Sequence, residues 1–312
     1  MDGLESRVYP GISKGMNSIV AENATLRTEV IPELGGKIVS LLYKPTGKEW
    51  MMDSGNRPLK QPVYGSTFTN WDMSGWDECF PTINPCMTGE KGDISLPDHG
   101  EIWSLPWESH TTETKVICSV QGKQLPYRFS RELLLDGDKT VRLAYTVENT
   151  GDAPLPFLWT AHPQFKIDEP TDIVLPDAMR NLLCVFGGGK YETGSSYRTP
   201  ETWTVGTETD GDGRKFYYPH PVSEAWSGLY GRTTRNYLLL RTDGSQVPYW
   251  GVWIDQGMCN DRTTIALEPG IGYYDSLERA VSNGTAVTLG PGESDCWDLE
   301  IILGNGDWRI GL

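Results

Sequence analysis

Two titratable residues of this chain stand at the ends of apolar, strand-like segments, where they could take part in chemistry. His162 lies in FLWTAHPQFKI, and Glu268 lies in TTIALEPGIGYYD. Proline cannot donate a hydrogen bond to a sheet ladder, so Pro163 predicts that regular pairing ends beside the histidine. Charged groups in apolar surroundings are costly unless they are paired or functional. The structural alternatives are a buried core histidine and a strand-end glutamate that points to water.

His99, in LPDHGEIW, is the second candidate histidine. Gly100 follows it and permits a close approach of backbone or ligand. The structural alternative is a turn histidine bonded to its acidic neighbour. No HxH pair accompanies it, so the sequence does not predict a metal site. We expect the remaining histidines, His110 and His220, to be solvated loop residues.

The tract NWDMSGWDECFPTINPC combines tryptophan with acidic residues among turn formers. Indole rings stack on the C–H faces of pyranose sugars, and carboxylates accept hydrogen bonds from hydroxyl groups. Trp76, Asp77 and Glu78 are therefore candidate sugar-binding residues, with a tryptophan-rich core loop as an equal alternative. A glycosidase would use two carboxylates, which Asp77, Glu78 and Glu268 could also supply.

The segments that must position these residues have the pattern of strands joined by turns. Val141, Leu143, Tyr145 and Val147 alternate with polar residues, which is the period of a half-buried strand. DGDK precedes this run and follows FSRELLL, which predicts a hairpin. The same pattern predicts hairpins at 24–43, 236–254 and 284–303. Helical periodicity is nearly absent, and short helical turns are expected only at 275–281 or 222–228.

The composition supports the same fold class. The chain of 312 residues has 35 Gly and 21 Pro together with 12 Trp and 14 Tyr, which is typical of strands linked by many turns. The polar stretch 205–215 is expected to be a surface loop rather than a domain boundary. We predict one all-β domain over residues 1–312, a large antiparallel β-sandwich.

The net charge of −15 argues against nucleic acid and anionic membrane surfaces as partners. No apolar run approaches the ~18 residues of a membrane helix, and the N-terminal residues do not resemble a signal peptide. The six cysteines form no CxxC pair, which favours reduced thiols in a cytoplasmic protein. GGGK at 187–190 does not fit a P-loop, and neither GxSxG nor GxGxxG is present.

Five segments, in this order, resemble the aldose 1-epimerase (galactose mutarotase-like) superfamily. They are VIPELGGKIVSL, PDHGEIW, YTVENTGDAPLPFLWTAHPQF, LEPGIGYYD and LGPGESDCWDLEIIL, which together span about residues 30–302. The resemblance implies the galactose mutarotase supersandwich, with an open concave face that holds a sugar. It also implies that His162 is the general acid, that Glu268 is the general base, and that His99 binds the sugar near its ring oxygen.

Trp159 and Asp255 complete the candidate sugar-binding residues, the latter as the best match for an aspartate of the family. The family arginine before the first His-Gly has no clear equivalent, since Arg57 lies in no shared motif, and residues 170–235 match no part of the pattern. No arginine cluster is present to bind a phosphorylated sugar.

We therefore expect an isomerase of the aldose 1-epimerase type that acts on a small-molecule sugar. Acid–base ring opening needs neither a metal nor an organic cofactor. The alternatives are another acid–base epimerase or a lyase acting on a modified sugar, and a non-catalytic carbohydrate-binding protein of the same fold. The expected assembly is a monomer or a homodimer.

Overall fold

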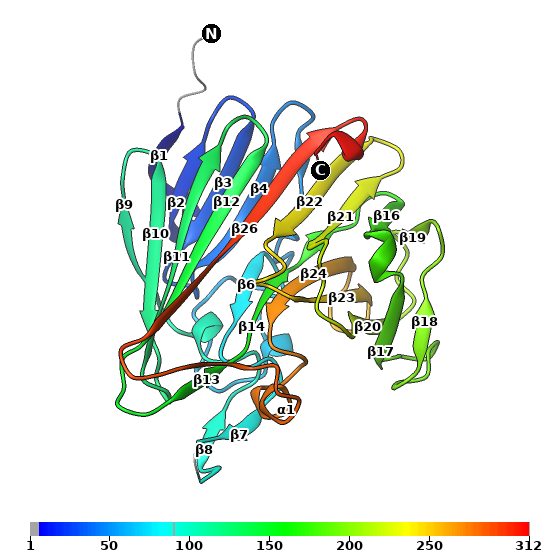
Figure 1. The fold of residues 1–312 in the computed structure, drawn as a ribbon. Helices are drawn as coiled ribbons and strands as arrows, with labels where there is room; N and C mark the ends of the chain where they lie inside the picture. The colour runs from blue at the N-terminus through cyan, green and yellow to red at the C-terminus, as the bar shows by residue number, and fades with distance from the viewer. Residues whose placement is uncertain (1–5, 90, 312) are drawn as a thin grey trace.

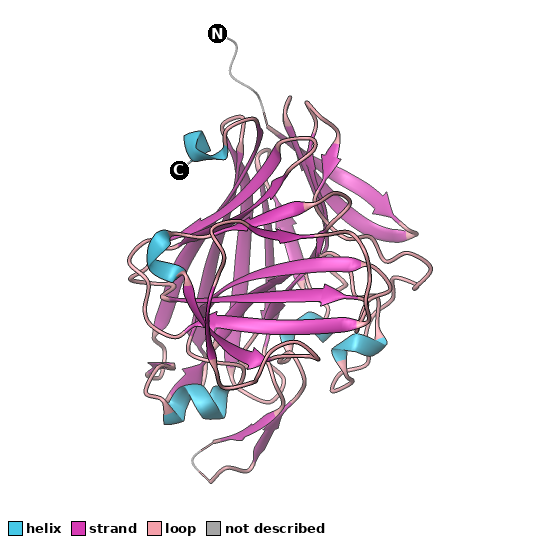
Figure 2. Cartoon of the chain, turned by 90° about the vertical axis from the view of Figure 1, so that its right-hand side faces the viewer, coloured by secondary structure: helices cyan, strands magenta, loops and turns pink. Residues whose placement is uncertain are grey.

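The computed structural model describes residues 6–89 and 91–311, and nearly all of its regular structure is β-strand (Figures 1 and 2). Within these residues the strands form two large antiparallel sheets, of thirteen and nine strands, and two small two-stranded sheets. The all-β antiparallel sandwich expected from the sequence is therefore confirmed.

The thirteen-stranded sheet contains the strands that carry the candidate catalytic residues. In hydrogen-bonding order it consists of β1 (Arg7–Ser13), β2 (Met16–Glu22), β3 (Leu26–Ile31), β4 (Lys37–Tyr43), β6 (Trp76–Cys79), β14 (Trp159–Pro163), β24 (Thr263–Ile271), β23 (Tyr249–Gln256), β20 (Asp212–Tyr218), β17 (Asn181–Phe186) and β18 (Ser196–Arg198). Two short strands lie off this path: β5 (Lys48–Glu49) pairs with β4, and β15 (Phe165–Lys166) pairs with β24.

The nine-stranded sheet packs against this one. Its order is β19 (Trp203–Val205), β16 (Thr171–Val174), β21 (Trp226–Gly231), β22 (Asn236–Thr242), β26 (Ser294–Asn305), β12 (Thr140–Asn149), β11 (Tyr127–Asp136), β10 (Lys115–Gln121) and β9 (Glu108–Thr111). The small sheets pair β13 (Leu155–Phe157) with β25 (Val287–Leu289), and β7 (Cys86–Thr88) with β8 (Ile94–Leu96).

Helices are short. They are α1 (Leu277–Ser282) and the 3₁₀ turns η1 (Phe68–Asn70), η2 (Ile102–Ser104), η3 (Asp177–Met179) and η4 (Trp308–Gly311). The helical turn expected at 275–281 corresponds to α1, whereas 222–228 leads into β21 instead. Among the described residues no helix is long and apolar enough to cross a membrane. All six cysteines, each of them described, are free thiols.

The hairpin predicted at DGDK is confirmed, with β11 and β12 paired along their whole length. β12 buries Val141, Leu143, Tyr145 and Val147 in alternation, as expected. The β3–β4 pair within 24–43 is likewise an antiparallel hairpin.

Two other predicted hairpins are wrong, although their strands exist. β22 and β23, within 236–254, lie in different sheets, and β25 pairs with β13 rather than with β26. β22, β23 and β26 each have other partners on both edges, and β25 pairs with β13 in a separate small sheet, so the intervening turns connect different sheets. The stretch 205–215 is also only partly a loop, because β20 begins at Asp212.

Aromatic side chains fill the space between the two large sheets. Phe80, Phe129, Tyr145 and Trp159 are fully buried in one core cluster with Trp297. The Tyr145 and Trp297 rings stack with centroids 5.5 Å apart. Burial of this aromatic surface fixes the spacing of the two sheets, because each ring removes a large apolar area from water.

One ion pair is embedded in this aromatic core. Arg131 on β11 lies 2.9 Å from Glu78 on β6, and both side chains are almost completely buried. The Tyr145 hydroxyl and the Trp159 indole also donate hydrogen bonds to the Glu78 carboxylate. Burial raises the pKa of Glu78 to about 6, although Arg131 opposes the shift. The pair therefore ties the two sheets together through polar contacts.

Replacing Arg131 with methionine tests this role. The variant leaves a buried carboxylate without its cation, so we expect the free energy of unfolding to fall by about 3–5 kcal/mol in urea denaturation. Arg142→Met is the matched control on the adjacent strand, because Arg142 and its partner Asp298 are both more than two-fifths exposed. That change should cost about 0–1 kcal/mol. Equal losses in the two variants would contradict a special role for the buried pair.

Candidate active site

His162 and Glu268 face each other on neighbouring strands of the thirteen-stranded sheet. β14 pairs with β24 through Thr160, and β15 resumes the pairing in the same register at Phe165. The register between these two points places His162 directly opposite Glu268, where no ladder pairing is present. The Nε2 atom of His162 lies 3.9 Å from Oε1 of Glu268.

Pro163 interrupts pairing on one side of β14 only. Towards β24 the ladder stops after Thr160, as the sequence predicts for a strand that contains a proline. Towards β6 the pairing continues, with His162 opposite Asp77 and Pro163 opposite Trp76. The interruption therefore opens the sheet on the side where His162 meets Glu268.

His99 reaches the same place from the loop after β8. Its ring centroid lies 4.8 Å from that of His162. Gly100 permits this approach, because its φ is +74° and an added Cβ would lie 2.2 Å from the Phe80 carbonyl oxygen. Nδ1 of His99 lies 3.0 Å from the carboxylate of Asp98, which leaves Nε2 to face other groups. The acidic neighbour expected for a turn histidine thus orients the ring.

Phe68 covers both imidazoles. Its ring stacks on His99 with centroids 4.3 Å apart and meets His162 edge-on at 5.0 Å. The backbone N–H of Phe68 donates to the carboxylate of Asp98, so the same aspartate holds both the ring and the histidine beneath it. His99 and His162 retain side-chain exposures of 17% and 8%, so water has little access to the pair.

Glu268 is held on its other side by Lys215 of β20. The ammonium group lies 2.9 Å from Oε2 of Glu268 and 3.1 Å from the carboxylate of Asp275. β23 lies between β20 and β24, and its Gly251 leaves room for the contact between Lys215 and Glu268. An added Cβ at Gly251 would lie 3.0 Å from Oε2 of Glu268. The two oxygens of Glu268 therefore have different surroundings: Oε2 faces Lys215, and Oε1 has no hydrogen-bond partner in the described chain.

Burial shifts the proton affinities of the pair towards each other. It lowers the pKa of His162 well below its usual range, and the charges of His99, Lys215 and Lys37 act in the same direction. Burial also raises the pKa of Glu268, and the ion pair with Lys215 opposes that rise. Desolvation thus favours the neutral form of both groups, and their mutual attraction favours the charged forms.

The candidate sugar-binding residues are divided between the two faces of this sheet. Side chains alternate along a strand, so Trp76, Glu78 and Trp159 point away from His162 and into the interior between the sheets. Trp159 donates its indole N–H to Glu78 within that core. The structure does not bring these three residues together with the histidines.

Asp77 points to the His162 face but is engaged by a buried cation. Lys37 of β4 lies 2.6 Å from Asp77 and 2.9 Å from Asp72, and all three side chains are almost inaccessible to water. Burial raises the pKa of Asp77 to about 6, against the effect of Lys37. Asp77 is therefore part of a buried ion-pair network next to His162.

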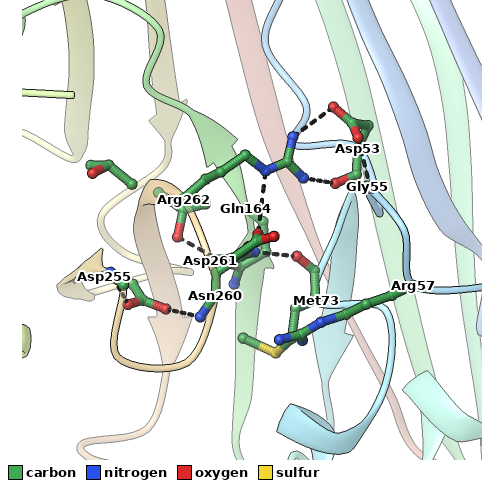
Figure 3. Close-up of polar contacts among 12 residues, drawn as sticks. Asp53, Gly55, Arg57, Met73, Gln164, Asp255, Asn260, Asp261 and Arg262 are labelled. Atoms are coloured by element: carbon green, nitrogen blue, oxygen red, sulfur yellow. Dashed lines mark hydrogen bonds and ion pairs between the residues drawn. The ribbon is translucent and has the colours of Figure 1, made fainter. Parts of the chain in front are cut away.

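Asp255 lies on the same face, at the far end of β23, where it closes a turn (Figure 3). Its carboxylate accepts hydrogen bonds from the backbone N–H groups of residues 257–260. Asn260 in turn donates its side-chain amide to the Met73 carbonyl. Arg57 donates to the carbonyls of Trp71 and Cys259. Both Asp255 and Arg57 thus stabilise the loops beside the sheet.

A metal ion could be held here only by an unusual donor set. Cys79, His99 and His162 offer ligand atoms that all lie within 4.8 Å of one another. Donor atoms around a tetrahedral zinc ion are about 3.5 Å apart, so the present arrangement is looser than ligation requires. The sequence does not show that Cys79, His99 and His162 lie close together, because they come from three separate segments.

Sequence reasoning missed Lys215, Phe68 and Gly251. Lys215 was assigned to the end of a surface loop, although its alternation with Tyr217 in RKFYY is a usable strand signal. An isolated glycine inside the strand YWGVWIDQ likewise signals a close approach. Phe68 carries no such signal, because its position depends on a loop docking against Asp98.

Comparison with known proteins identifies the fold. No protein-family model matches the sequence, and no curated protein matches it. The Slr1438 protein from Synechocystis sp. PCC 6803 has a TM-score of 0.71 at 14% identity, covering 98% of each chain. A galactose mutarotase-like protein from Lactobacillus casei has a TM-score of 0.68 at 17% identity, covering 92% of this chain and 100% of that one.

A galactose mutarotase related enzyme from Lactobacillus acidophilus has a TM-score of 0.69 at 14% identity, covering 92% of this chain and 97% of that one. The chain therefore has the galactose mutarotase-like fold, and the resemblance seen in its sequence is confirmed at that level. At such low identity these likenesses establish the architecture alone.

Replacing Gly100 with alanine tests how His99 is positioned. We expect a larger loss of unfolding free energy than in Gly137→Ala, together with a changed NMR environment of the His99 ring. Gly137, in the β11–β12 turn, has a similar φ of +68° but open space around it. The control therefore carries only the left-handed backbone penalty, about 1–2 kcal/mol. Equal losses in the two variants and an unchanged His99 signal would contradict the close-approach argument.

Proposed function

We propose that this protein is an aldose 1-epimerase-like isomerase that interconverts the anomers of a free sugar or sugar derivative. The observation that carries the proposal is the pair formed by His162 and Glu268. Two titratable groups from neighbouring strands face each other at 3.9 Å, each with a buried atom that has no hydrogen-bond partner among the described residues. Unpartnered buried polar atoms are costly, and functional sites are where such cost is retained.

The chemistry of mutarotation suits this pair. In the proposed reaction Oε1 of Glu268 takes the proton of the anomeric hydroxyl, C1–O1 becomes a carbonyl, and the bond from C1 to the ring oxygen breaks. Protonated His162 gives its proton to the ring oxygen as that bond breaks. Rotation about C1–C2 and reversal of both proton transfers give the other anomer. His99, whose Nδ1 is held by Asp98, binds the sugar near the ring oxygen through Nε2.

The electrostatics support catalysis in both directions. The charged pair is needed before ring opening, and the neutral pair results from it. Burial favours the neutral pair, while attraction between opposite charges 3.9 Å apart favours the charged one. Opposing effects of this kind suit a reaction whose substrate and product are both cyclic sugars.

The fold neighbours support the same class of reaction, since two of them are described as galactose mutarotase-like or galactose mutarotase related. Phe68 contacts both imidazoles, so a bound sugar must displace its ring or stack against it. Trp253 is half-buried on the face that carries Lys215, and it is a further surface on which a sugar could stack.

Polarimetry on a panel of aldoses tests the proposal. Wild-type protein should accelerate mutarotation of at least one sugar, and Glu268→Gln and His162→Asn should each reduce that acceleration by roughly 100-fold or more. Glu268→Gln preserves the shape of the side chain, His162→Asn keeps a smaller polar group, and both remove the acid–base capacity. If sugars bind but mutarotation stays at its spontaneous rate for the whole panel, the protein is a carbohydrate-binding protein instead. Full activity in His162→Asn would show that His162 is not the acid.

The pH profile of the same reaction should depend on Lys215. Its positive charge disfavours proton binding at both Glu268 and His162, so removing it raises the pKa of each group. In Lys215→Met the acidic and basic limbs of the kcat/KM profile should both move to higher pH, by about 1 unit or more.

Lys215→Arg is the matched control, because it keeps the charge, and its profile should stay close to that of the wild type. A uniform loss of rate without any shift of the limbs would show that Lys215 acts only as a structural support.

A further inference from the structure

A second cavity lies on the other sheet, away from His162 and Glu268. Its volume is about 490 Å³, and its walls come from β16, β19, β21, η3 and η4. β19, β16 and β21 form one end of the nine-stranded sheet (Figure 1), whereas the candidate active site lies on the thirteen-stranded sheet. None of the residues that line this cavity belongs to that site.

Three tryptophans from separate segments converge on the cavity: Trp203, Trp226 and Trp308. The chain has twelve tryptophans, and the seven that fill its core are at most 4% exposed, namely Trp50, Trp76, Trp103, Trp107, Trp159, Trp250 and Trp297. Only five are half-exposed, and three of these five surround this one cavity. Such clustering differs from the scattered exposure expected of surface apolar residues.

The indoles present both apolar faces and free donors. The Trp226 and Trp308 rings lie 5.7 Å apart at 43° and form one wall. In the described part of the chain, no hydrogen bond engages the indole N–H of Trp203, Trp226 or Trp308. The carboxylates of Glu201 and Glu224, which also line the cavity, likewise have no hydrogen-bond or ion-pair partner there.

The charges of the lining identify the class of ligand. Three carboxylates, including Asp177, stand against the guanidinium groups of Arg180 and Arg309. Arg180 is already paired with Asp177 at 2.8 Å, and Arg309, which lies over the Trp308 ring, is paired with Asp307 at 3.2 Å. Both cations among the described lining residues therefore already have a carboxylate partner, which disfavours an anionic ligand. Aromatic faces beside unpaired carboxylates and N–H donors instead match the C–H faces and hydroxyl groups of a neutral sugar.

From these observations we infer a second, non-catalytic saccharide site at Trp203, Trp226 and Trp308, which binds a neutral pyranose mono- or disaccharide. The cavity volume lies within the range of small-molecule sites. The inference does not depend on the proposed isomerase activity, because it rests on a different sheet and on binding alone.

Fluorine NMR of protein labelled with fluorotryptophan tests the site directly. Neutral mono- and disaccharides are titrated into the His162→Asn variant, with each resonance assigned by a Trp→Phe substitution. The Trp226 and Trp308 resonances should shift together in a saturable manner. Trp226→Ala should weaken this binding by roughly tenfold or more, and Trp226→Phe, which keeps an aromatic face, should weaken it less.

Trp253→Ala is the matched control, because Trp253 is half-buried on the other sheet, and it should leave this binding unchanged. Shifts confined to the Trp253 resonance would place the sugar only at the candidate active site and overturn the inference. Unshifted Trp226 and Trp308 resonances for every sugar of the panel would also overturn it, as would unchanged affinity in Trp226→Ala with the remaining resonances still dispersed as in the folded protein.

Discussion

One electrostatic constraint governs the candidate site: the Glu268 carboxylate lies inside a sheet from which water is almost excluded. Glu268 meets this constraint with one oxygen against Lys215 and the other facing His162. Lys215 limits the cost of burial at Oε2 and leaves Oε1 facing His162. Asp275 shares the ammonium group, so the cation is itself compensated. The pair formed by His162 and Glu268 therefore depends on four consecutive strands, β14, β24, β23 and β20, and not on any one motif.

The alternation of side chains along β6 and β14 separates structure from chemistry. One face of these strands carries His162, Asp77 and Cys79, and the other carries Trp76, Glu78 and Trp159. The second group builds the core that fixes the sheet spacing, with Arg131 neutralising Glu78 from the opposite sheet. Neighbouring residues of β6 and β14 thus lie on opposite faces of the sheet: one set lines the candidate site, and the other packs in the core beneath it.

The sequence predicts the strands far better than their partners. Alternation predicts β12 and the β11–β12 hairpin, and the order of the motifs groups His99, His162 and Glu268, which the structure places side by side. Pairing across β22 and β23 was mispredicted, because a turn signal is local while the choice of sheet depends on distant strands. The sequence does not predict that Lys215 and Phe68 belong to the site, for the same reason: their positions depend on contacts between segments far apart in the chain.

The decisive measurement is a crystal structure of Glu268→Gln with a bound aldose, because this variant should bind the sugar without converting it. We expect the anomeric hydroxyl to lie within hydrogen-bond distance of the Gln side chain at position 268. The ring oxygen should lie against His162, with Phe68 displaced or stacked on the sugar. A sugar bound at the tryptophan cavity alone, or one whose anomeric carbon lies away from both residues, would contradict this expectation.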